Sequence, residues 1–399
     1  MQKQRHNYVL LLLAMITPCL ATAQKKELSQ ARSYIKSGKD YDKAEKLMTG
    51  LLQKDSANRD NMRVYLTWLE AVKGQYDQAN ERLYLKQNQD TAAFFALCRR
   101  MFTVAETLDS LDMRPDKKGR VAPEYRQKHA ELLNNYRPNL FGGGTFHVRK
   151  GNYKEAFSYF ESYIDCARQP LFAAYRYDSL DRRMPEAAYW ATFSAYKQQD
   201  PVLTLRYRKL ALSDSTKAQF TLQYIAEARR WLKDDELYTG TLEEGFRCFP
   251  LSPYFFPRLY DAYVQQGRTD KALNLCDSAL ALNDSSELYL FAKSTTLLSL
   301  ERYDESVRVS EQLIAINDSL PEVYFNAGTA YLNIALKLNP RKNKKQVNTI
   351  YQKARSYMER YRQLAPDEKQ KWGPTLYRIY LNLNMGKQFD EIDKLLKQP

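Results

Sequence analysis

Apolar residues recur at helical spacing along most of the chain. The segments KALNLCDSALALN, from Lys271, and ESVRVSEQLIAIN, from Glu305, place apolar side chains three or four residues apart. This spacing puts them on one face of an α-helix. Short polar runs, several of which contain glycine, separate such segments as turns would. The pattern predicts an all-α protein built from many short amphipathic helices.

A short motif precedes several of the helical segments. Its clearest copies read GQYDQA, GNYKEA and GRTDKA, and they start at Gly74, Gly151 and Gly267. Looser copies start at Gly38, Glu301 and Gly386. The last residue of the motif is small in most copies and returns with a period near 34 residues, or near 48 where a loop is inserted. In chain order this position holds Ala44, Ala79, Ala156, Thr204, Tyr238, Ala272, Ser306, Ala354 and Ile392.

The period and the motif resemble those of the tetratricopeptide repeat (TPR) family. The best copy has Y-x-x-A-G-x-x-Y from Tyr324 to Tyr331, followed by Ala354 and Pro366. The resemblance covers most of residues 25–399. It implies a right-handed TPR-like α-solenoid of about eight to nine helix-turn-helix units. Neighbouring units must stack, because one pair of helices cannot bury its own apolar face.

The first residues have the plan of a secretory signal peptide, which we place at 1–23. Lys3 and Arg5 form a positive start, an apolar run follows, and Ala21-Thr22-Ala23 is a small-x-small cleavage site. No second long apolar run follows, so we expect no transmembrane segment in the mature chain. We therefore expect an exported, periplasmic protein. Secretion and lipid attachment at Cys19 are the alternatives, and Pro18 before that cysteine disfavours lipidation.

The pattern divides the mature chain at two basic loops. Segments 92–112 and 122–136 predict two atypical helices joined by the polar run MRPDKKGRVAP. A second basic run, NPRKNKKQ, starts at Asn339. We interpret both runs as solvated loops. The expected parts are N-terminal TPR-like units with an atypical helix (24–112), a basic loop (113–121), and a C-terminal superhelix (122–399) with an insertion near 339–347.

The stretch NLFGGGTFHVRKGNY, from Asn139, could suggest a phosphate-binding loop. However, FGGGT, FAKST and FNAGT are three copies of F-x-x-[GS]-T, which start at Phe141, Phe291 and Phe325. The Lys-Ser/Thr ending of a phosphate loop is absent, and so is a G-x-S-x-G nucleophile motif. The repeat needs one small residue here, and three helical glycines cost about 2–3 kcal/mol relative to alanines. Either the helix starts irregularly after Pro138, or another group approaches its backbone closely.

Composition narrows the function further. The formal net charge of +14 favours anionic surroundings, and export argues against nucleic acid. We expect no cofactor, and with only His129 and His147 beyond the signal segment we expect no metal site. The four cysteines of the mature chain are either buried single thiols or partly paired; they are Cys98, Cys166, Cys248 and Cys276.

We expect a non-catalytic scaffold that binds protein partners of the cell envelope. In the TPR family the first helices of the repeats line the binding surface, and several aromatic residues fall there by analogy. These rings could instead fill the junctions between repeats. Acidic glycan or peptidoglycan is the alternative ligand. A toroidal helical hydrolase is the least favoured hypothesis. The candidate partner-binding residues are Trp68, Phe141, Thr145, Tyr189, Phe193, Tyr196, Phe291, Thr295, Phe325 and Thr329.

The TPR family's carboxylate-clamp members carry lysine and asparagine where phenylalanine and threonine stand here. Recognition on this face should therefore be apolar, or by stacking of aromatic rings on sugars. The export signal and the Gln24 that follows it resemble those of Bacteroidota-type TPR proteins.

We predict that the mature protein begins at Gln24, because Ala21 and Ala23 provide the small residues that signal peptidase requires. N-terminal sequencing or the intact mass of exported protein measures this. A diacylated species that starts at Cys19 would contradict the prediction and indicate an outer-membrane lipoprotein.

Overall fold

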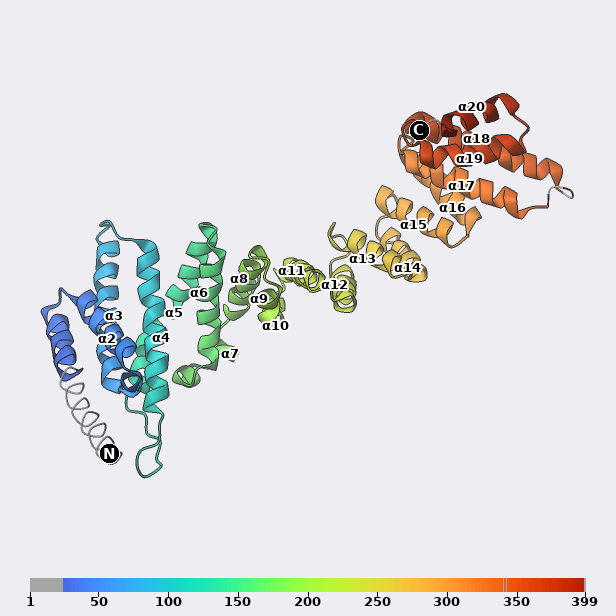
Figure 1. The fold of residues 1–399 in the computed structure, drawn as a ribbon. Helices are drawn as coiled ribbons and strands as arrows, with labels where there is room; N and C mark the ends of the chain where they lie inside the picture. The colour runs from blue at the N-terminus through green and yellow to red at the C-terminus, as the bar shows by residue number, and fades with distance from the viewer. Residues whose placement is uncertain (1–23, 340, 342, 398–399) are drawn as a thin grey trace, which may run out of the picture. The chain divides into compact units, whose positions relative to one another are not determined.

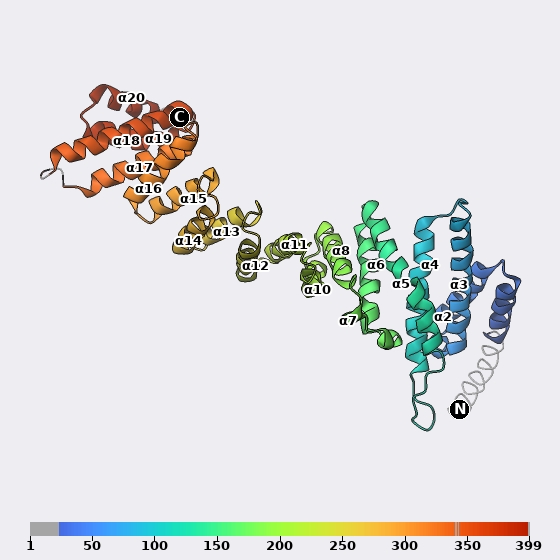
Figure 2. The ribbon, with the colours of Figure 1, turned by 180° about the vertical axis from the view of Figure 1, so that it is seen from behind.

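The structure is a computed structural model that describes residues 24–339, 341 and 343–397. The expected signal peptide, 1–23, lies outside the described residues. The chain divides into two compact units, with the boundary between Asp234 and Asp235. Throughout the described segments the regular elements are α-helices and short 3-10 helices, and consecutive helices pack against each other (Figures 1 and 2). None of the described helices is long and apolar enough to span a membrane.

Unit 1, up to Asp234, stacks antiparallel helical hairpins. A helix over residues 24–37 shares a buried cluster with α2. The hairpins α3–α4 and α5–α6 follow, then α8 with α9 and α10, and finally α11. The loop between α4 and α5 projects past the helix ends (Figure 1). The bounds are α2 Tyr41–Lys54, η1 Ser56–Asp60, α3 Met62–Tyr84, α4 Thr91–Asp112, α5 Arg126–Arg149, α6 Tyr153–Asp165, η2 Cys166–Arg168, η3 Pro170–Tyr175, α7 Tyr177–Leu180, α8 Met184–Lys197, α9 Pro201–Arg206, α10 Arg208–Leu212 and α11 Ala218–Trp231.

Unit 2, from Asp235 onward, continues the same plan. After α12 it forms the hairpins α13–α14, α15–α16, α17–α18 and α19–α20, and each hairpin packs on the next. The chain thus has the TPR-like α-solenoid fold in both units. The bounds are α12 Asp235–Cys248, α13 Phe255–Gln265, α14 Thr269–Leu280, α15 Glu287–Ser299, α16 Tyr303–Ile316, α17 Pro321–Lys337, α18 Lys344–Leu364, α19 Lys369–Asn382 and α20 Gly386–Lys397.

Several turns between consecutive helices share one hydrogen-bonded geometry. After α13, Gly267 N–H donates to the carbonyl of Val264 (3.0 Å) and Arg268 N–H donates to the carbonyl of Tyr263 (2.8 Å). Gly267 has φ +67°, the left-handed conformation that glycine adopts without strain. The same pair of bonds closes the turns at Gly151, Gln199, Lys233, Glu301 and Asn384, which all have positive φ. The turn is therefore kept even where glycine is absent.

Two positions of the repeat register need correction. The copy GQYDQA is not a turn, because α3 continues from Met62 to Tyr84 without a break. Ala79 therefore lies in the same helix as Gly74, rather than at the start of a second helix. In α12 the small buried residue is Thr239 instead of Tyr238, which is half-buried. The remaining predicted small positions are fully buried: Ala44, Ala156, Thr204, Ala272, Ser306, Ala354 and Ile392.

The three consecutive glycines lie inside α5, which runs through Pro138 without interruption. The expected helix end near residue 136 is therefore wrong. An aromatic ring faces each glycine: an added Cβ would lie 3.3 Å from Phe95 at Gly142, 2.8 Å from Tyr159 at Gly143 and 2.6 Å from Phe160 at Gly144. Of the two explanations for the glycines, close approach of neighbouring groups is the one that the structure supports.

The four cysteines within the described residues are free thiols. Cys98, Cys166 and Cys276 are buried, as one of the two expectations held, whereas Cys248 is exposed near the end of α12. Burial raises the pKa of the Cys98 and Cys276 thiols to about 12, so both remain protonated at neutral pH.

We predict opposite outcomes for two neighbouring glycines of α5. Gly144→Ala should lower the free energy of unfolding by about 1–3 kcal/mol, because the fully buried ring of Phe160 cannot move away from the new methyl group. Gly142→Ala is the matched control. It should be neutral or stabilise by up to about 1 kcal/mol, since Phe95 is only half-buried and alanine favours the helix. Urea unfolding measures both, and equal effects would refute the packing argument.

Candidate binding surface

The predicted partner-binding residues are distributed over both units and lie at several places within unit 1. Tyr189 is buried, and the others are half-buried. The contacts that each ring or hydroxyl already makes within the protein therefore determine whether it is available to a partner. Unit 1 contains Trp68, Phe141, Thr145, Tyr189, Phe193 and Tyr196, and unit 2 contains Phe291, Thr295, Phe325 and Thr329.

Trp68 takes part in a polar network within unit 1. Its indole Nε1 donates to Glu45 Oε1 (3.0 Å), and Gln75 Nε2 donates to Glu45 Oε2 (2.7 Å). Arg100 Nη1 donates to both carboxylate oxygens, at 2.8 and 3.0 Å. Glu45 is only 9% exposed, so this buried carboxylate needs these donors. The Trp68 N–H is thus satisfied inside the protein, and only part of its ring remains for a partner.

Phe141 packs into a cluster of rings beside a buried ion pair. It makes edge contacts with Phe160 and Tyr163, at centroid distances of 5.4 and 5.7 Å. Tyr163 in turn stacks on the guanidinium of Arg137, which is 5% exposed and donates to Asp181 Oδ2 (2.6 Å). These contacts favour the interpretation of Phe141 as a residue that fills a repeat junction.

The Thr145 hydroxyl, one turn after Phe141, donates to the carbonyl of Gly142 (2.9 Å) within its own helix. It therefore serves α5 itself, and its donor is not free for a partner in this arrangement.

The four candidates of unit 2 also lie at a junction between repeats. Phe325 contacts the ring of Tyr361, at 5.4 Å, and Tyr361 is fully buried. Thr295 Oγ1 accepts a hydrogen bond from Asn326 Nδ2 (3.0 Å), which ties α15 to α17. Phe291 packs against the same core as Phe325. Packing between helices accounts for Phe291, Thr295 and Phe325, whereas the buried hydroxyl of Thr329 has no hydrogen-bond partner among the described residues.

Tyr189, Phe193 and Tyr196 belong to a larger aromatic cluster, and sequence reasoning found only these members. The aromatic cluster comprises Tyr189, Trp190, Phe193 and Tyr196 of α8 with Tyr224 and Trp231 of α11. The Tyr196 ring stacks on Tyr224 (4.6 Å, 25°) and on Trp231 (5.6 Å, 12°). Tyr224 and Trp231 are seven residues apart, two helical turns, so their spacing could have placed them on one face.

The edges of the aromatic cluster are cationic and partly open. The Lys197 ammonium lies 5.6 Å from the Phe193 ring, and that of Lys217 lies 5.8 Å from Tyr189. Burial, followed by a hydrogen bond with Tyr189, raises the pKa of Tyr224, so its hydroxyl stays neutral at physiological pH. Phe220, one turn before Tyr224 on α11, is 46% exposed. Such a surface can stack on flat apolar groups beside an anion.

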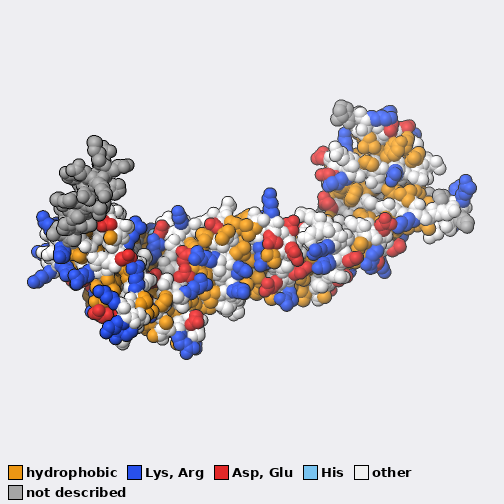
Figure 3. All heavy atoms as spheres, turned by 60° about the horizontal axis from the view of Figure 1, so that its bottom comes forward, with side chains coloured by type: hydrophobic (Ala, Val, Ile, Leu, Met, Phe, Trp, Pro, Cys, Tyr) orange, Lys and Arg blue, Asp and Glu red, His pale blue; other side chains and the backbone are white. Residues whose placement is uncertain are grey.

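Hydrophobic side chains also reach the surface elsewhere. On the face drawn in Figure 3 they gather in patches in each unit, between lysine and arginine side chains. The aromatic cluster joins more stacked rings than the comparable half-buried pair of unit 2, where Tyr331 stacks on Tyr357 (5.6 Å, 22°).

Unit 1 also contains a carboxyl group that titrates near neutrality. Burial, with a smaller effect of Asp165, raises the pKa of Glu106 to about 7. Asp165 accepts a hydrogen bond from the Tyr207 hydroxyl (3.0 Å), and Arg206 pairs with Glu161 (2.6 Å). Among the described residues, no group of three or more histidine, cysteine or acidic side chains could hold a metal ion.

Comparisons with known proteins concern the fold alone. The sequence matches no protein-family model. No curated protein matches it either. Among solved structures, MamA from Desulfovibrio magneticus RS-1 is 17% identical with a TM-score of 0.37, and the match covers 45% of this chain and 95% of that chain.

Two further solved structures are similar to more of the chain. The C-terminal part of a TPR repeat-containing protein from Cytophaga hutchinsonii is 14% identical, with a TM-score of 0.43 over 64% of this chain and 93% of that chain. PilF from Pseudomonas aeruginosa is 14% identical, with a TM-score of 0.32 over 61% and 95%. The TPR-like α-solenoid fold rests on the stacked helical hairpins of the chain itself.

We predict that Glu106 makes unit 1 less stable as pH rises from about 4.5 to 8. Its pKa is raised in the folded state, so the folded protein holds a proton that the unfolded chain releases at lower pH. This contribution is complete below pH 4.5 and is lost as pH rises through about 7. Glu106→Gln mimics the protonated group, so it should be more stable than wild type at pH 8 and close to it at pH 4.5.

Chemical unfolding across this pH range tests the prediction. The matched control is Glu70→Gln, at an exposed position of α3, whose difference from wild type should be constant with pH. A constant difference for Glu106→Gln as well would show that this carboxyl group is not buried in the folded state.

Proposed function

We propose that the protein is an exported, non-catalytic scaffold that binds a protein partner of the cell envelope through the aromatic cluster of unit 1. The observation that carries this proposal is the stack of Tyr196 between Tyr224 and Trp231, on the adjacent helices α8 and α11. The secretory plan of the first residues supports export, and the TPR-repeat fold supports partner binding in place of catalysis.

The aromatic cluster is a better candidate than the other predicted positions. Trp68 donates a hydrogen bond to the buried, ion-paired Glu45, and Phe141 packs against neighbouring rings. Phe325 lies against a fully buried tyrosine. In the aromatic cluster, by contrast, the half-buried Tyr196, Tyr224 and Trp231 stack on one another rather than on fully buried rings. Tyrosine and tryptophan are the residues that most often dominate binding energy at protein interfaces.

The surroundings of the aromatic cluster indicate what the partner should offer. Lys197 and Lys217 place positive charge at its edges. A partner segment with an aromatic or aliphatic anchor next to an acidic side chain would match this pattern. The rings could also stack on a sugar, so an acidic glycan is the competing ligand that an experiment has to separate.

We predict that Tyr196→Ala and Trp231→Ala abolish capture of the envelope partner, because they remove the centre and one side of the ring stack. Each should reduce capture at least ten-fold, as loss of a dominant interface residue does. Crosslinking in the native envelope, followed by quantitative pulldown, measures the loss. Leu180→Ala, an exposed apolar residue of unit 1 outside the aromatic cluster, is the control and should leave capture unchanged.

Thermal unfolding must accompany the capture experiment, since the rings also contact each other. Normal capture by both folded variants would contradict the proposal. Calorimetry with a panel of acidic glycans separates the competing ligand: binding of a glycan that both variants lose, without any captured protein, would assign the aromatic cluster to a sugar.

A further inference from the structure

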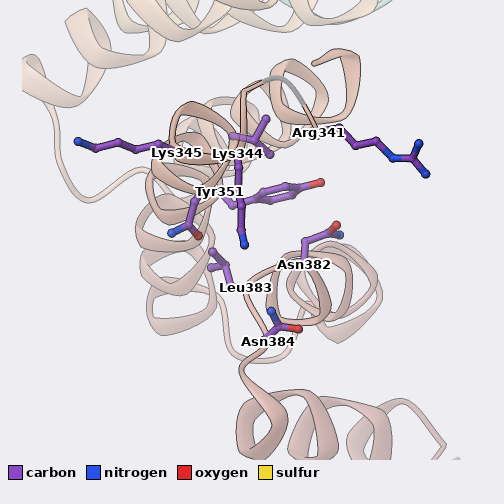
Figure 4. A pocket seen from close by; sticks show the side chains of 9 residues that line it. Arg341, Lys344, Lys345, Tyr351, Asn382, Leu383 and Asn384 are labelled. Atoms are coloured by element: carbon purple, nitrogen blue, oxygen red, sulfur yellow. The ribbon is translucent and has the colours of Figure 1, made fainter. Parts of the chain in front are cut away.

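Unit 2 contains an open cavity of about 820 Å³ where the start of α18 meets the turn between α19 and α20 (Figure 4). One wall is the basic run from Asn339 that we interpreted as a solvated loop, and the other wall comes from the next hairpin, which the sequence pattern did not place beside it. The residues that line it are Arg341, Lys344, Lys345, Val347, Asn348, Tyr351, Asn382, Leu383 and Asn384.

The cavity is lined by cations and contains no acidic residue. Arg341, Lys344 and Lys345 contribute to its wall, and within the described chain none of them forms an ion pair. The amino group of Lys344 extends into the cavity, whereas Arg341 and Lys345 point outward on either side (Figure 4). Lys344 therefore suits direct contact with an anion, and the other two raise the local positive potential.

The same wall is the N-terminus of a long helix. Helix α18 begins at Lys344, with no acidic residue in its first turn and no side-chain hydrogen bond from Asn343 to cap it. The first N–H groups of a helix lack partners within the helix and carry partial positive charge. Lysines at this end add like charge to that dipole. This concentration of positive charge at the start of α18 is unfavourable, and a bound anion would offset it.

Tyr351 gives an independent indication of a ligand. Its side chain is 5% exposed, and within the described residues its hydroxyl has no hydrogen-bond partner. The hydroxyl points into the cavity, between the sides formed by Arg341 and Asn382 (Figure 4). The oxygen reaches the open cavity instead of being sealed in the core, so the hydroxyl is available to bond to a ligand. Burial also raises the pKa of Tyr351, so the group is a neutral donor.

The opposite side of the cavity consists of carboxamides and an apolar residue. Asn382 Nδ2 donates to the carbonyl of Arg378 (2.8 Å), which fixes its side chain. Asn384 has φ +55° in the turn after α19, where backbone hydrogen bonds at Asn384 and Met385 hold it in place. Carboxamides both donate and accept hydrogen bonds, as sugar hydroxyl groups do. Leu383 adds a small apolar surface between them.

We propose that this cavity binds a small, hydroxyl-rich oxyanion, namely a sugar that carries a carboxylate or phosphate group. The oxyanion lies at the start of α18, against Lys344 and the Tyr351 hydroxyl, and the sugar hydroxyls face Asn382 and Asn384. The volume supports a ligand of this size, because cavities of roughly 300–1,000 Å³ typically hold small molecules and greatly exceed what a single phosphate needs. The proposal is independent of the aromatic cluster, which lies in the other unit.

Calorimetry on the mature protein with glucuronate, glucose 6-phosphate, inorganic phosphate and glucose tests the proposal. At least one of the two acidic sugars should bind at low salt, more weakly as salt rises, and glucose should not bind. The stronger of the two identifies the oxyanion as carboxylate or phosphate. Inorganic phosphate should bind at least ten-fold more weakly than the preferred sugar, because it does not reach Asn382 and Asn384.

Two variants assign the binding to this cavity. Tyr351→Phe removes only the hydroxyl and Lys344→Gln only the charge, and each should weaken binding by about ten-fold or more, as loss of a hydrogen bond to a charged group does. The matched controls are Tyr377→Phe, a half-buried tyrosine of α19, and Lys369→Gln, at the start of α19. Both should bind like wild type.

Three results would overturn the proposal. The first is that neither acidic sugar binds. The second is that Tyr351→Phe and Lys344→Gln, with unchanged thermal unfolding, bind as tightly as wild type. The third is that inorganic phosphate binds as tightly as the preferred sugar, which would refute the role of the carboxamides. None of these results bears on capture of a protein by unit 1, so the two proposals fail separately.

Discussion

This fold depends on one kind of contact, in which an aromatic ring or other side chain packs directly on the backbone of a glycine. The contact lets neighbouring helices approach each other closely. Gly74 meets Tyr41, Gly144 meets Phe160, and Gly245 meets Phe255. In each case a Cβ would overlap the ring, so the ring can be buried only because the glycine has none. Glycine weakens a helix by about 1 kcal/mol relative to alanine, whereas burial of a phenylalanine side chain stabilises the fold by roughly 1.5–3 kcal/mol. The exchange is favourable wherever the ring becomes fully buried.

This contact also allows some aromatic rings to be fully buried. Phe160 and Phe255, which pack on glycines, are fully buried, whereas the rings of the aromatic cluster have no glycine facing them and stack on one another. Rings that stack on rings leave their outer faces and edges half-buried. The abundance of tyrosine in the chain therefore serves two purposes, since a phenol can fill a repeat junction or remain at the surface with its hydroxyl hydrated.

The sequence allowed the fold to be predicted because its signal is periodic and local. Ala272 and Ser306 recur at the repeat interval, and both are fully buried. The errors arose where one local pattern has two structural meanings. GQYDQA has the letters of the turn motif, but its glycine receives a ring inside the continuous helix α3. Glu301, conversely, adopts the left-handed turn conformation without being glycine. A glycine thus marks either a turn or a close contact, and the sequence alone does not separate them.

The candidate sites were less predictable, because they depend on which side chains remain after the core is filled. Family analogy selected Phe141 and Phe325, and both proved to pack against interior rings. Tyr351 was not selected, since a tyrosine in an amphipathic helix is ordinarily a packing residue. What singles it out is a hydroxyl without a protein partner that opens into a cavity, beside unpaired cations at the start of its own helix and asparagines of the next hairpin. Packing contacts follow from the periodicity of the sequence, whereas unsatisfied polar groups become visible only in three dimensions, and these are the groups that point to a ligand.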